Sequence, residues 1–351
     1  MDYKRKALKV KQSPGLVRFF RLIFVLILGI SLNHPPALAG PDENTVKSPQ
    51  GAEKGMGWSP DANWVDIGFG YFFSRSSSSW EISFPGLEGR GRSVLEFNGM
   101  DSPVPYLFGE IKHPRYRLSF SFLYGAGDNA GGQGTDADYT GGDLDLRSRF
   151  DIAGETTLWI ADVQRAFSFF NNRLIVKPFL GWKHYEERLR LTNGYWTMIR
   201  GVESGKPIFG LNSTYDFSWD SLRVGLKSQW DFIKRPQSGL DQVSLKGTLA
   251  LFPYTRYRGQ GTWNLREDFR KDPSFSHEAD SIGLTGLDGV LAIAYRPWKY
   301  FEVEAGGWIS FFKVWDGSDT TYFSDQTTAV ATLEEAKALR LGFFVQMIGR
   351  F

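Results

Sequence analysis

The C-terminal segment constrains the fold most, because apolar and polar residues alternate along it. Its apolar set is Leu339, Leu341, Phe343, Val345 and Met347, and Arg340, Gly342, Gln346 and Arg350 lie at the intervening positions up to Phe351. A two-residue period in an extended strand places one set on each face of a sheet. Such a strand at the end of an exported chain is typical of the last strand of a bacterial outer-membrane barrel.

The N-terminal segment has the pattern of an export signal. Basic residues are frequent at positions 4–21, an apolar run follows at 22–32, and Ala37-Leu38-Ala39 comes after a pair of prolines. A run of about 11 residues is shorter than the roughly 20 that a membrane helix needs, and Ala-x-Ala precedes a typical cleavage site. We therefore expect residues 1–39 to be a signal peptide, with an uncleaved anchor as the alternative. Residues 40–60 are expected to be a flexible segment and 61–351 the barrel domain.

Composition agrees with a barrel and excludes several kinds of site. The 351 residues include 39 Gly, 12 Trp, 14 Tyr and 29 Phe, and the mean hydropathy is only −0.29. No stretch after the leader is a candidate membrane helix, so a chain that crosses the membrane must close into a barrel. A large secreted β-sandwich has a similar composition, and the terminal strand favours the barrel. The absence of Cys excludes disulfides and thiolate sites, and 41 basic against 39 acidic residues give no support for a nucleic-acid partner.

Short turns and long polar stretches alternate after residue 60. Short turns are expected at 113–115, 171–173, 235–239 and 296–299, and long loops at 76–91, 126–144, 192–206, 260–274 and 315–335. Bacterial barrels have short periplasmic turns and long extracellular loops. The sequence therefore predicts an all-β transmembrane antiparallel barrel of ten strands, at residues 62–75, 91–112, 115–127, 144–169, 172–192, 206–233, 240–260, 274–296, 299–315 and 336–351. Trp182, Trp219, Trp298 and Trp308 are expected in the aromatic belts at the membrane interfaces.

Two of the predicted outer segments carry a resemblance to a known family. Residues 80–84 read Trp-Glu-Ile-Ser-Phe and lead through 88–97 into a strand, and residues 131–139 read Gly-Gly-Gln-Gly-Thr-Asp-Ala-Asp-Tyr. These segments are similar to the first and second outer loops of the omptins, which are outer-membrane endopeptidases built as ten-stranded barrels. The resemblance implies that Asp136 and Asp138 are half of a catalytic group and that Glu81 lines a pocket for a basic substrate residue.

The fourth outer loop departs from the omptin pattern. Omptins carry an Asp-x-His there, which faces the aspartate pair across the cleft, whereas residues 261–273 contain no histidine. A general base must come within hydrogen-bond reach of the proton that it takes. Asp268 remains a candidate for holding a water molecule, and His277 is the histidine nearest to this loop.

The carboxylates also permit a reading that involves no catalysis. Asp136 and Asp138 occupy positions i and i+2 of an extended segment, so they point the same way, and their coupled titration raises one pKa. This arrangement suits a site that polarises water, and it also suits a solvated acidic loop. A second set of acids, Glu81, Glu267 and Asp268, is expected at the same rim, where the combined charge would attract cationic peptides.

Three functions follow as hypotheses. The first is an omptin-like barrel with an acidic extracellular cleft that lacks the complete catalytic group and acts as a surface binding or structural protein. The second is an endopeptidase that cleaves near basic residues, and the third is a small channel. The channel is the weakest, because water-filled lumens belong to barrels of about 16 or more strands. We expect a monomer in the outer membrane with no metal or cofactor, with lipopolysaccharide as a candidate bound lipid and cationic peptides as candidate partners.

Overall fold

The structure is a computed structural model that describes residues 64–86, 89–113, 115–234 and 242–351. The chain divides into two units, Met1–Trp58 and Ser59–Phe351, and the second unit contains all the described residues. The expected signal peptide and flexible segment lie outside these residues and remain predictions. No helix in the described part of the chain is long and apolar enough to cross a membrane.

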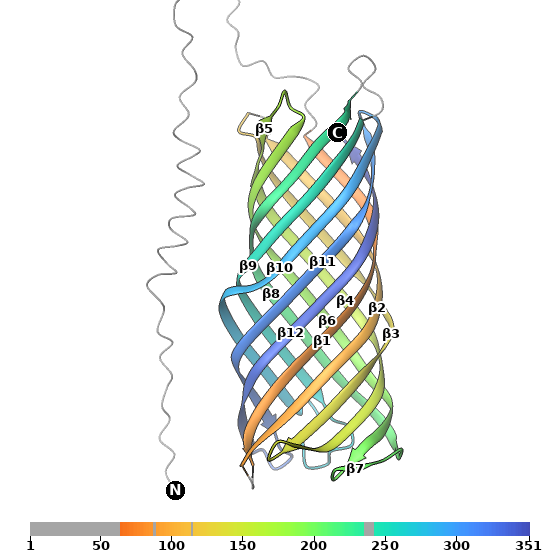
Figure 1. Ribbon diagram of the computed structural model, residues 1–351, viewed down its shortest axis with the longest axis vertical. Coiled ribbons are helices and arrows are strands. Elements are labelled where there is room, and N and C mark those ends of the chain that lie inside the picture. The colour runs from red at the N-terminus through yellow and green to blue at the C-terminus, as the bar shows by residue number, and fades with distance from the viewer. Residues whose placement is uncertain (1–63, 87–88, 114, 235–241) are drawn as a thin grey trace, which may run out of the picture. The chain divides into compact units, whose positions relative to one another are not determined.

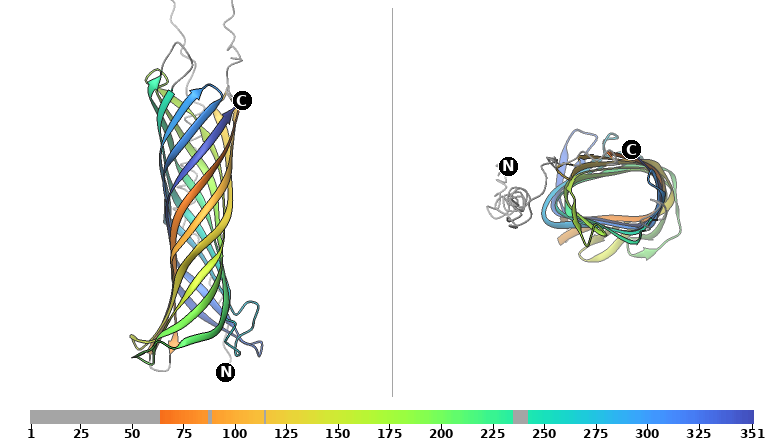
Figure 2. Two further views of the ribbon diagram at one scale, coloured as in Figure 1. Left: turned by 90° about the vertical axis from the view of Figure 1, so that its right-hand side faces the viewer. Right: turned by 90° about the horizontal axis from the view of Figure 1, so that it is seen from above.

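Ten long antiparallel strands of the described chain form a closed barrel (Figure 1). They are β1 (Val65–Gly86), β2 (Gly89–His113), β3 (Leu118–Thr140), β4 (Asp143–Arg165), β6 (Leu174–Ile199), β8 (Pro207–Lys234), β9 (Gln242–Thr262), β10 (Phe275–Trp298), β11 (Phe301–Tyr322) and β12 (Thr328–Arg350). Two short strands, β5 (Phe167–Phe169) and β7 (Val202–Glu203), pair with β6. Pairing of β1 with β12 and of β4 with β6 closes the ring, which is visible along the barrel axis (Figure 2). The prediction of a ten-stranded antiparallel barrel is confirmed.

The two ends of the barrel domain lie together. The backbone N–H of Val65, where β1 begins, donates to the carbonyl of Phe351 at 3.0 Å, and β12 ends one residue earlier at Arg350. An even number of strands returns the chain to the face on which it began. In bacterial barrels this is the periplasmic face, where the short turns also lie.

The strands extend further outward than the sequence indicates. Most of the expected loop at 126–144 belongs to β3 and β4, which are joined through Gly141 and Gly142, both with positive φ. The expected loops at 76–91, 192–206 and 315–335 are likewise mostly strand, whereas 263–274 is a true loop between β9 and β10. The sequence predicts loops in these segments because they are polar and rich in glycine and lack the apolar alternation of a membrane strand. A strand whose outer side faces water can form without that alternation.

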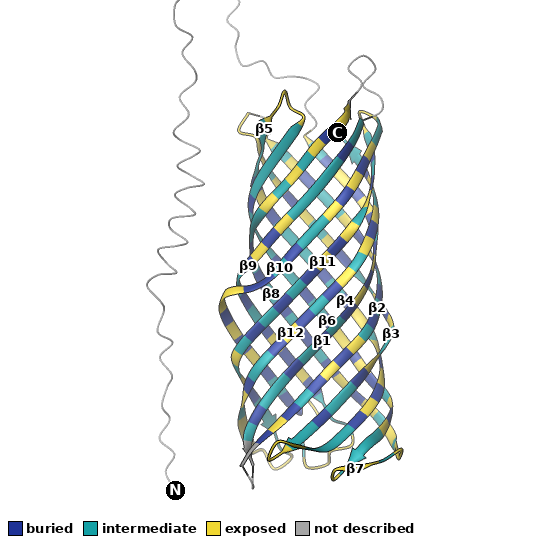
Figure 3. Ribbon diagram, in the orientation of Figure 1, coloured by how far each residue is buried: buried dark blue, intermediate teal, exposed yellow. Residues whose placement is uncertain are grey.

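Alternation along β12 follows the predicted faces. Leu341, Phe343 and Met347 point outward and are 49%, 58% and 51% exposed, whereas Arg340 is 3% exposed on the lumen side. The same exchange of exposed and buried positions runs along the other strands (Figure 3). Phe343 also stacks on Phe73 of β1 at 4.9 Å between ring centroids, which is a cross-strand contact of the outer surface.

Two of the four tryptophans expected in the aromatic belts lie elsewhere. Trp298 is 56% exposed on the outer surface, but Trp219 and Trp308 are 1% and 7% exposed and line the lumen. The prediction is wrong for these two residues, because a shift of one position in a strand moves a side chain to the other face.

The outward position of Phe343 generates a test. Substitution Phe343→Arg exposes a charge to the hydrocarbon. For a position near the midplane, it is expected to decrease the free energy of unfolding in lipid by about 2–4 kcal/mol. The control Val330→Arg places the same side chain on the same strand near its outer tip, where Val330 is 67% exposed, and should change folding little. Refolding titrations in lipid vesicles measure the difference. Equal loss in the two variants would contradict the assigned membrane face.

Candidate functional site

The aspartate pair lies at the outer end of the lumen on β3. Asp136 is opposite Leu95 and Asp138 is opposite Ser93 in the register of β2 and β3. Both partners are buried, with exposures of 0% and 8%. Residues directly opposite in a sheet point to the same face, so both carboxylates project inward.

The pair holds a proton more tightly than isolated carboxylates do. Burial, followed by the charge of Asp138, raises the pKa of Asp136 to about 8. Burial also raises the pKa of Asp138, against the opposing effects of a hydrogen bond with Ser93 and the charge of Arg266. Two carboxylates this close do not both ionise readily, and at neutral pH the pair retains a proton.

Arg266, in the loop between β9 and β10, supplies the positive charge that acts on both aspartates. Its guanidinium contacts Asp268 through two hydrogen bonds of 3.0 and 2.9 Å and lies over the ring of Phe269 at 4.1 Å. A guanidinium stays protonated and has no acceptor, so it cannot take a proton from water. We call Asp136, Asp138 and Arg266 the outer mouth.

The two acids of this loop point to solvent. The Asp268 side chain is 55% exposed, and its hydrogen bonds from Arg266 lower its pKa. Glu267 is exposed as well. The Arg266 side chain is 56% exposed, and its charge, rather than that of Asp268 or Glu267, acts on both aspartates.

Glu81 lies on the outside of the barrel. Its carboxylate is 2.7 Å from the guanidinium of Arg92, which also lies over the ring of Tyr139 at 5.2 Å. The preceding residue, Trp80, is 6% exposed and points into the lumen. Of the five acids expected to converge on one cleft, only Asp136 and Asp138 do so. Glu81 points to the outside of the barrel, and Glu267 and Asp268 are solvated.

His277 lies inside the barrel in an aromatic enclosure. It is 1% exposed, its ring is 4.5 Å from that of Trp80, and Phe275 packs against it at 5.1 Å. Nδ1 is 3.1 Å from Oδ1 of Asp319, its register partner on β11. The charges that act on Asp136 are those of Asp138 and Arg266, so the structure associates His277 with Asp319 rather than with the aspartate pair.

Below the outer mouth, three ion pairs cross the lumen. Lys183 contacts Asp288 at 2.6 Å, Arg223 contacts Asp162 at 2.7 Å, and Arg340 contacts Glu187 at 2.8 Å. All six side chains are at most 4% exposed. We call these three contacts the ion-pair layer.

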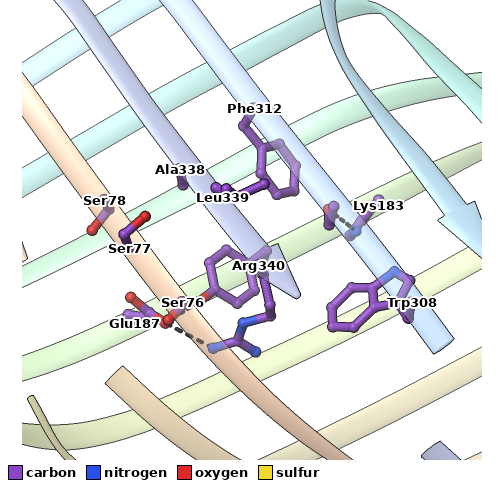
Figure 4. Close-up of a pocket in the computed structure, with 12 residues that line it drawn as sticks. Ser76, Ser77, Ser78, Lys183, Glu187, Trp308, Phe312, Ala338, Leu339 and Arg340 are labelled. Atoms are coloured by element: carbon purple, nitrogen blue, oxygen red, sulfur yellow. Dashed lines mark hydrogen bonds and ion pairs between the residues drawn. The ribbon is translucent and has the colours of Figure 1, made fainter. Parts of the chain in front are cut away.

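Aromatic rings fill the space around the ion-pair layer. The Nζ of Lys183 is 5.0 Å from the ring centroids of both Trp308 and Phe312, and these side chains gather with Arg340 around one small void (Figure 4). The void measures about 10 Å³, which is about the volume that one water molecule requires. The six side chains of the ion-pair layer are almost inaccessible to water, which indicates that side chains close the lumen at this level.

The fold and the comparisons define the class of protein. Among solved structures, the outer membrane protease OmpT from Escherichia coli is similar, with a TM-score of 0.66 and 10% identity over 83% of this chain and 98% of OmpT. At this identity the likeness shows the fold alone, which is omptin-like. A TodX deltaS2S3 mutant monoaromatic hydrocarbon channel (83% of this chain, 91% of that chain) and a Pseudomonas aeruginosa FadL homologue (82% and 90%) each give a TM-score of 0.24 at 7% identity, too low to support an argument.

The sequence also identifies a family. Residues 65–299 match the model of the Pom family, described as Protochlamydia outer membrane protein. The match spans more than half of the chain, so this protein belongs to the Pom family and is a β-barrel of the outer membrane. No curated protein matches the sequence.

Sequence reasoning missed Arg266 and Asp319, and the two omissions have different causes. Asp319 pairs with His277 across β10 and β11, but it lies in the segment 315–335 that the sequence predicts as a loop, so no register could be counted for it. Arg266 lies in the loop between β9 and β10, and no local pattern reports that its charge acts on residues of β3. One related signal is present in the sequence, the absence of a histidine from residues 261–273.

The raised pKa of Asp136 predicts a dependence of stability on pH. A folded-state pKa of about 8 against an ordinary value of 3.8 means that the folded state holds the proton more tightly. The free energy of unfolding should therefore fall as pH rises between these two values. Asp136→Asn should reduce the loss between pH 5 and pH 9 by about 1–3 kcal/mol, since water at the mouth screens part of the effect.

Denaturant titrations of the folded barrel at the two pH values provide the measurement. Glu267→Gln, which removes an exposed acid, is the matched control and should keep the parental slope. A slope that Asp136→Asn leaves unchanged would show that the aspartate is not held in its protonated form.

Proposed function

We propose that this outer-membrane barrel is a surface protein without peptidase activity that binds cationic peptide side chains at its outer mouth. The observation that carries the proposal is the placement of Arg266. Its charge acts on Asp136 and Asp138, where proteolysis of the omptin kind would need a base. The same two carboxylates remain suited to hold a positive group.

In this proposal Arg266 provides the positive charge near the aspartates when no peptide is bound. A guanidinium or ammonium group of a peptide would take over the interaction of the aspartates with Arg266, while Asp268 would keep Arg266 paired through its two hydrogen bonds. An internal competitor lowers the apparent affinity of any guest for the carboxylates. Binding should also strengthen as pH rises through about 8, because Asp136 then ionises.

The alternative is an outer-membrane endopeptidase that cleaves near basic residues. The aspartate pair with its retained proton favours this function, because such a pair can polarise water. The two candidates for the other half of a catalytic group are poorly placed for it. Asp268 is paired with Arg266 in solvent, and His277 is enclosed beside Asp319. We therefore place binding before catalysis.

The absence of a suitable base predicts negligible cleavage. General-base catalysis typically contributes about 10²–10⁴-fold to a rate, so the purified barrel supplemented with lipopolysaccharide should hydrolyse a fluorogenic dibasic peptide no faster than Asp136→Asn does. Rapid cleavage that is lost in Asp136→Asn and in Asp138→Asn would establish the endopeptidase instead.

Removal of the internal competitor should increase peptide binding. In Arg266→Ala a short Lys/Arg peptide is expected to bind about threefold to tenfold more tightly than in the parent, and the gain should shrink at high salt. The matched control is Arg270→Ala, because Arg270 lies in the same loop but over the ring of Tyr322 at 4.6 Å. Fluorescence anisotropy with a labelled peptide measures both.

The double substitution Asp136→Asn, Asp138→Asn should abolish the salt-sensitive binding. Equal affinities in the parent, in Arg266→Ala and in the double variant would remove the outer mouth as a binding site.

A further inference from the structure

A second compartment lies on the other side of the ion-pair layer. A cavity of about 230 Å³ extends from Asp288 and Trp308 to Asp66 and Arg350, at the end of the barrel where β1 begins and β12 ends. The ion-pair layer, whose six side chains are at most 4% exposed, lies between this cavity and the outer mouth. We call this compartment the inner cavity. It is a pocket in the periplasmic half of the lumen with a closed outer end.

The inner cavity is lined by both carboxylates and cations, and its lysines are more exposed than the carboxylates with which they pair. In three ion pairs the ammonium-bearing side chain is 22–24% exposed, whereas its carboxylate partner is 2–8% exposed. These pairs are Lys177 with Glu110, Lys227 with Asp162 and Lys246 with Glu302. A solute in the cavity therefore meets ammonium groups first, and the carboxylates behind them keep the cations from repelling one another.

Gln164 contributes an acceptor that the described residues leave unpaired. The side chain is 2% exposed and lines the cavity, and its Nε2 donates to Glu110 at 2.8 Å. Its Oε1 is buried and has no hydrogen-bond partner among the described residues. A buried acceptor without a donor is unfavourable, so a ligand hydroxyl would be stabilised there.

Apolar side chains also line the inner cavity. They are Phe108, Leu123, Leu158 and Ile160 from β2, β3 and β4. The volume is below the range of about 300–1,000 Å³ that is typical of sites for drug-sized ligands. The cavity therefore suits a small solute with a charged end and a short carbon chain.

We propose that the inner cavity is a periplasm-facing binding site for a small hydroxylated anion, of the class of phosphate monoesters of short polyols. Lysine ammonium groups bind phosphate as point charges, and Lys177, Lys227 and Lys246 place three of them in the lining of the cavity. The hydroxyl of the ligand donates to Oε1 of Gln164. The ligand is bound and released at the same end of the barrel, because the ion-pair layer closes the other end.

Calorimetric titration of the folded full-length barrel in detergent tests the proposal. The probes are glycerol 3-phosphate, inorganic phosphate and glycerol. We expect glycerol 3-phosphate to bind most tightly, phosphate to bind more weakly and glycerol to give no heat of binding. Equal responses to glycerol and glycerol 3-phosphate, or no binding of either anion, would overturn the proposal.

Two lysines form a matched pair of variants. Lys227→Gln removes a cation that lines the cavity, and Asp162 keeps its contact with Arg223 at 2.7 Å. Lys313→Gln removes a cation that is not part of the lining, and its partner Glu335 keeps Lys337 at 3.0 Å. Lys227→Gln should weaken binding of glycerol 3-phosphate by about tenfold, the equivalent of one lost charge contact, and Lys313→Gln should leave it nearly unchanged. Equal effects of the two variants would refute the cavity as the site.

Gln164→Leu gives a readout that does not depend on the lysines. It should reduce the affinity for glycerol 3-phosphate to that for inorganic phosphate, while the affinity for phosphate itself stays the same. Loss of both affinities, or of neither, would contradict the role of Oε1. Heat-dependent migration in gel electrophoresis verifies that each variant is folded.

Discussion

Closure of the barrel forces every inward side chain into one narrow lumen. In the ion-pair layer, each charge that is buried there contacts a charge of opposite sign. A charge in such a place is tolerated only with a partner in good geometry, because removal of one partner leaves an uncompensated buried charge. Lys183, Arg223 and Arg340 each have a carboxylate within 2.8 Å, and aromatic rings fill the remaining space. The layer divides the lumen into an outer mouth and an inner cavity with separate chemistry.

The outer mouth places two acids and one cation at the outer end of an omptin-like barrel. Asp136 and Asp138 share the inner face of β3, and their mutual repulsion and burial favour a retained proton. The charge of Arg266 acts on both aspartates, and a guanidinium donates hydrogen bonds but takes no proton. Function depends on these residues rather than on the barrel, because the likeness to OmpT at 10% identity shows the fold alone.

The sequence predicts those parts of the structure that depend on alternation within one strand. The outward set around Phe343 and the shared face of Asp136 and Asp138 follow from a period of two, and the number of strands follows from the alternation of short turns and long polar stretches. Glu81 and Trp219 show the limit of this reasoning, because an error of one position reverses the face. Alternation within one strand could not predict the role of Arg266, because this residue lies in the loop between β9 and β10 and its charge acts on a distant segment, β3. The outer halves of the strands were also missed, because polar segments that stand in water carry no membrane pattern.

Electrical recording from the parent barrel in a planar lipid bilayer tests the closed lumen most directly. Side chains fill the level of Lys183 and Phe312, and the void there measures about 10 Å³. The account predicts that insertion of the folded protein produces no stepwise increase in ionic current above that of the bare bilayer. Stable, uniform conductance steps from the parent would show a continuous aqueous path and contradict the separation of the outer mouth from the inner cavity.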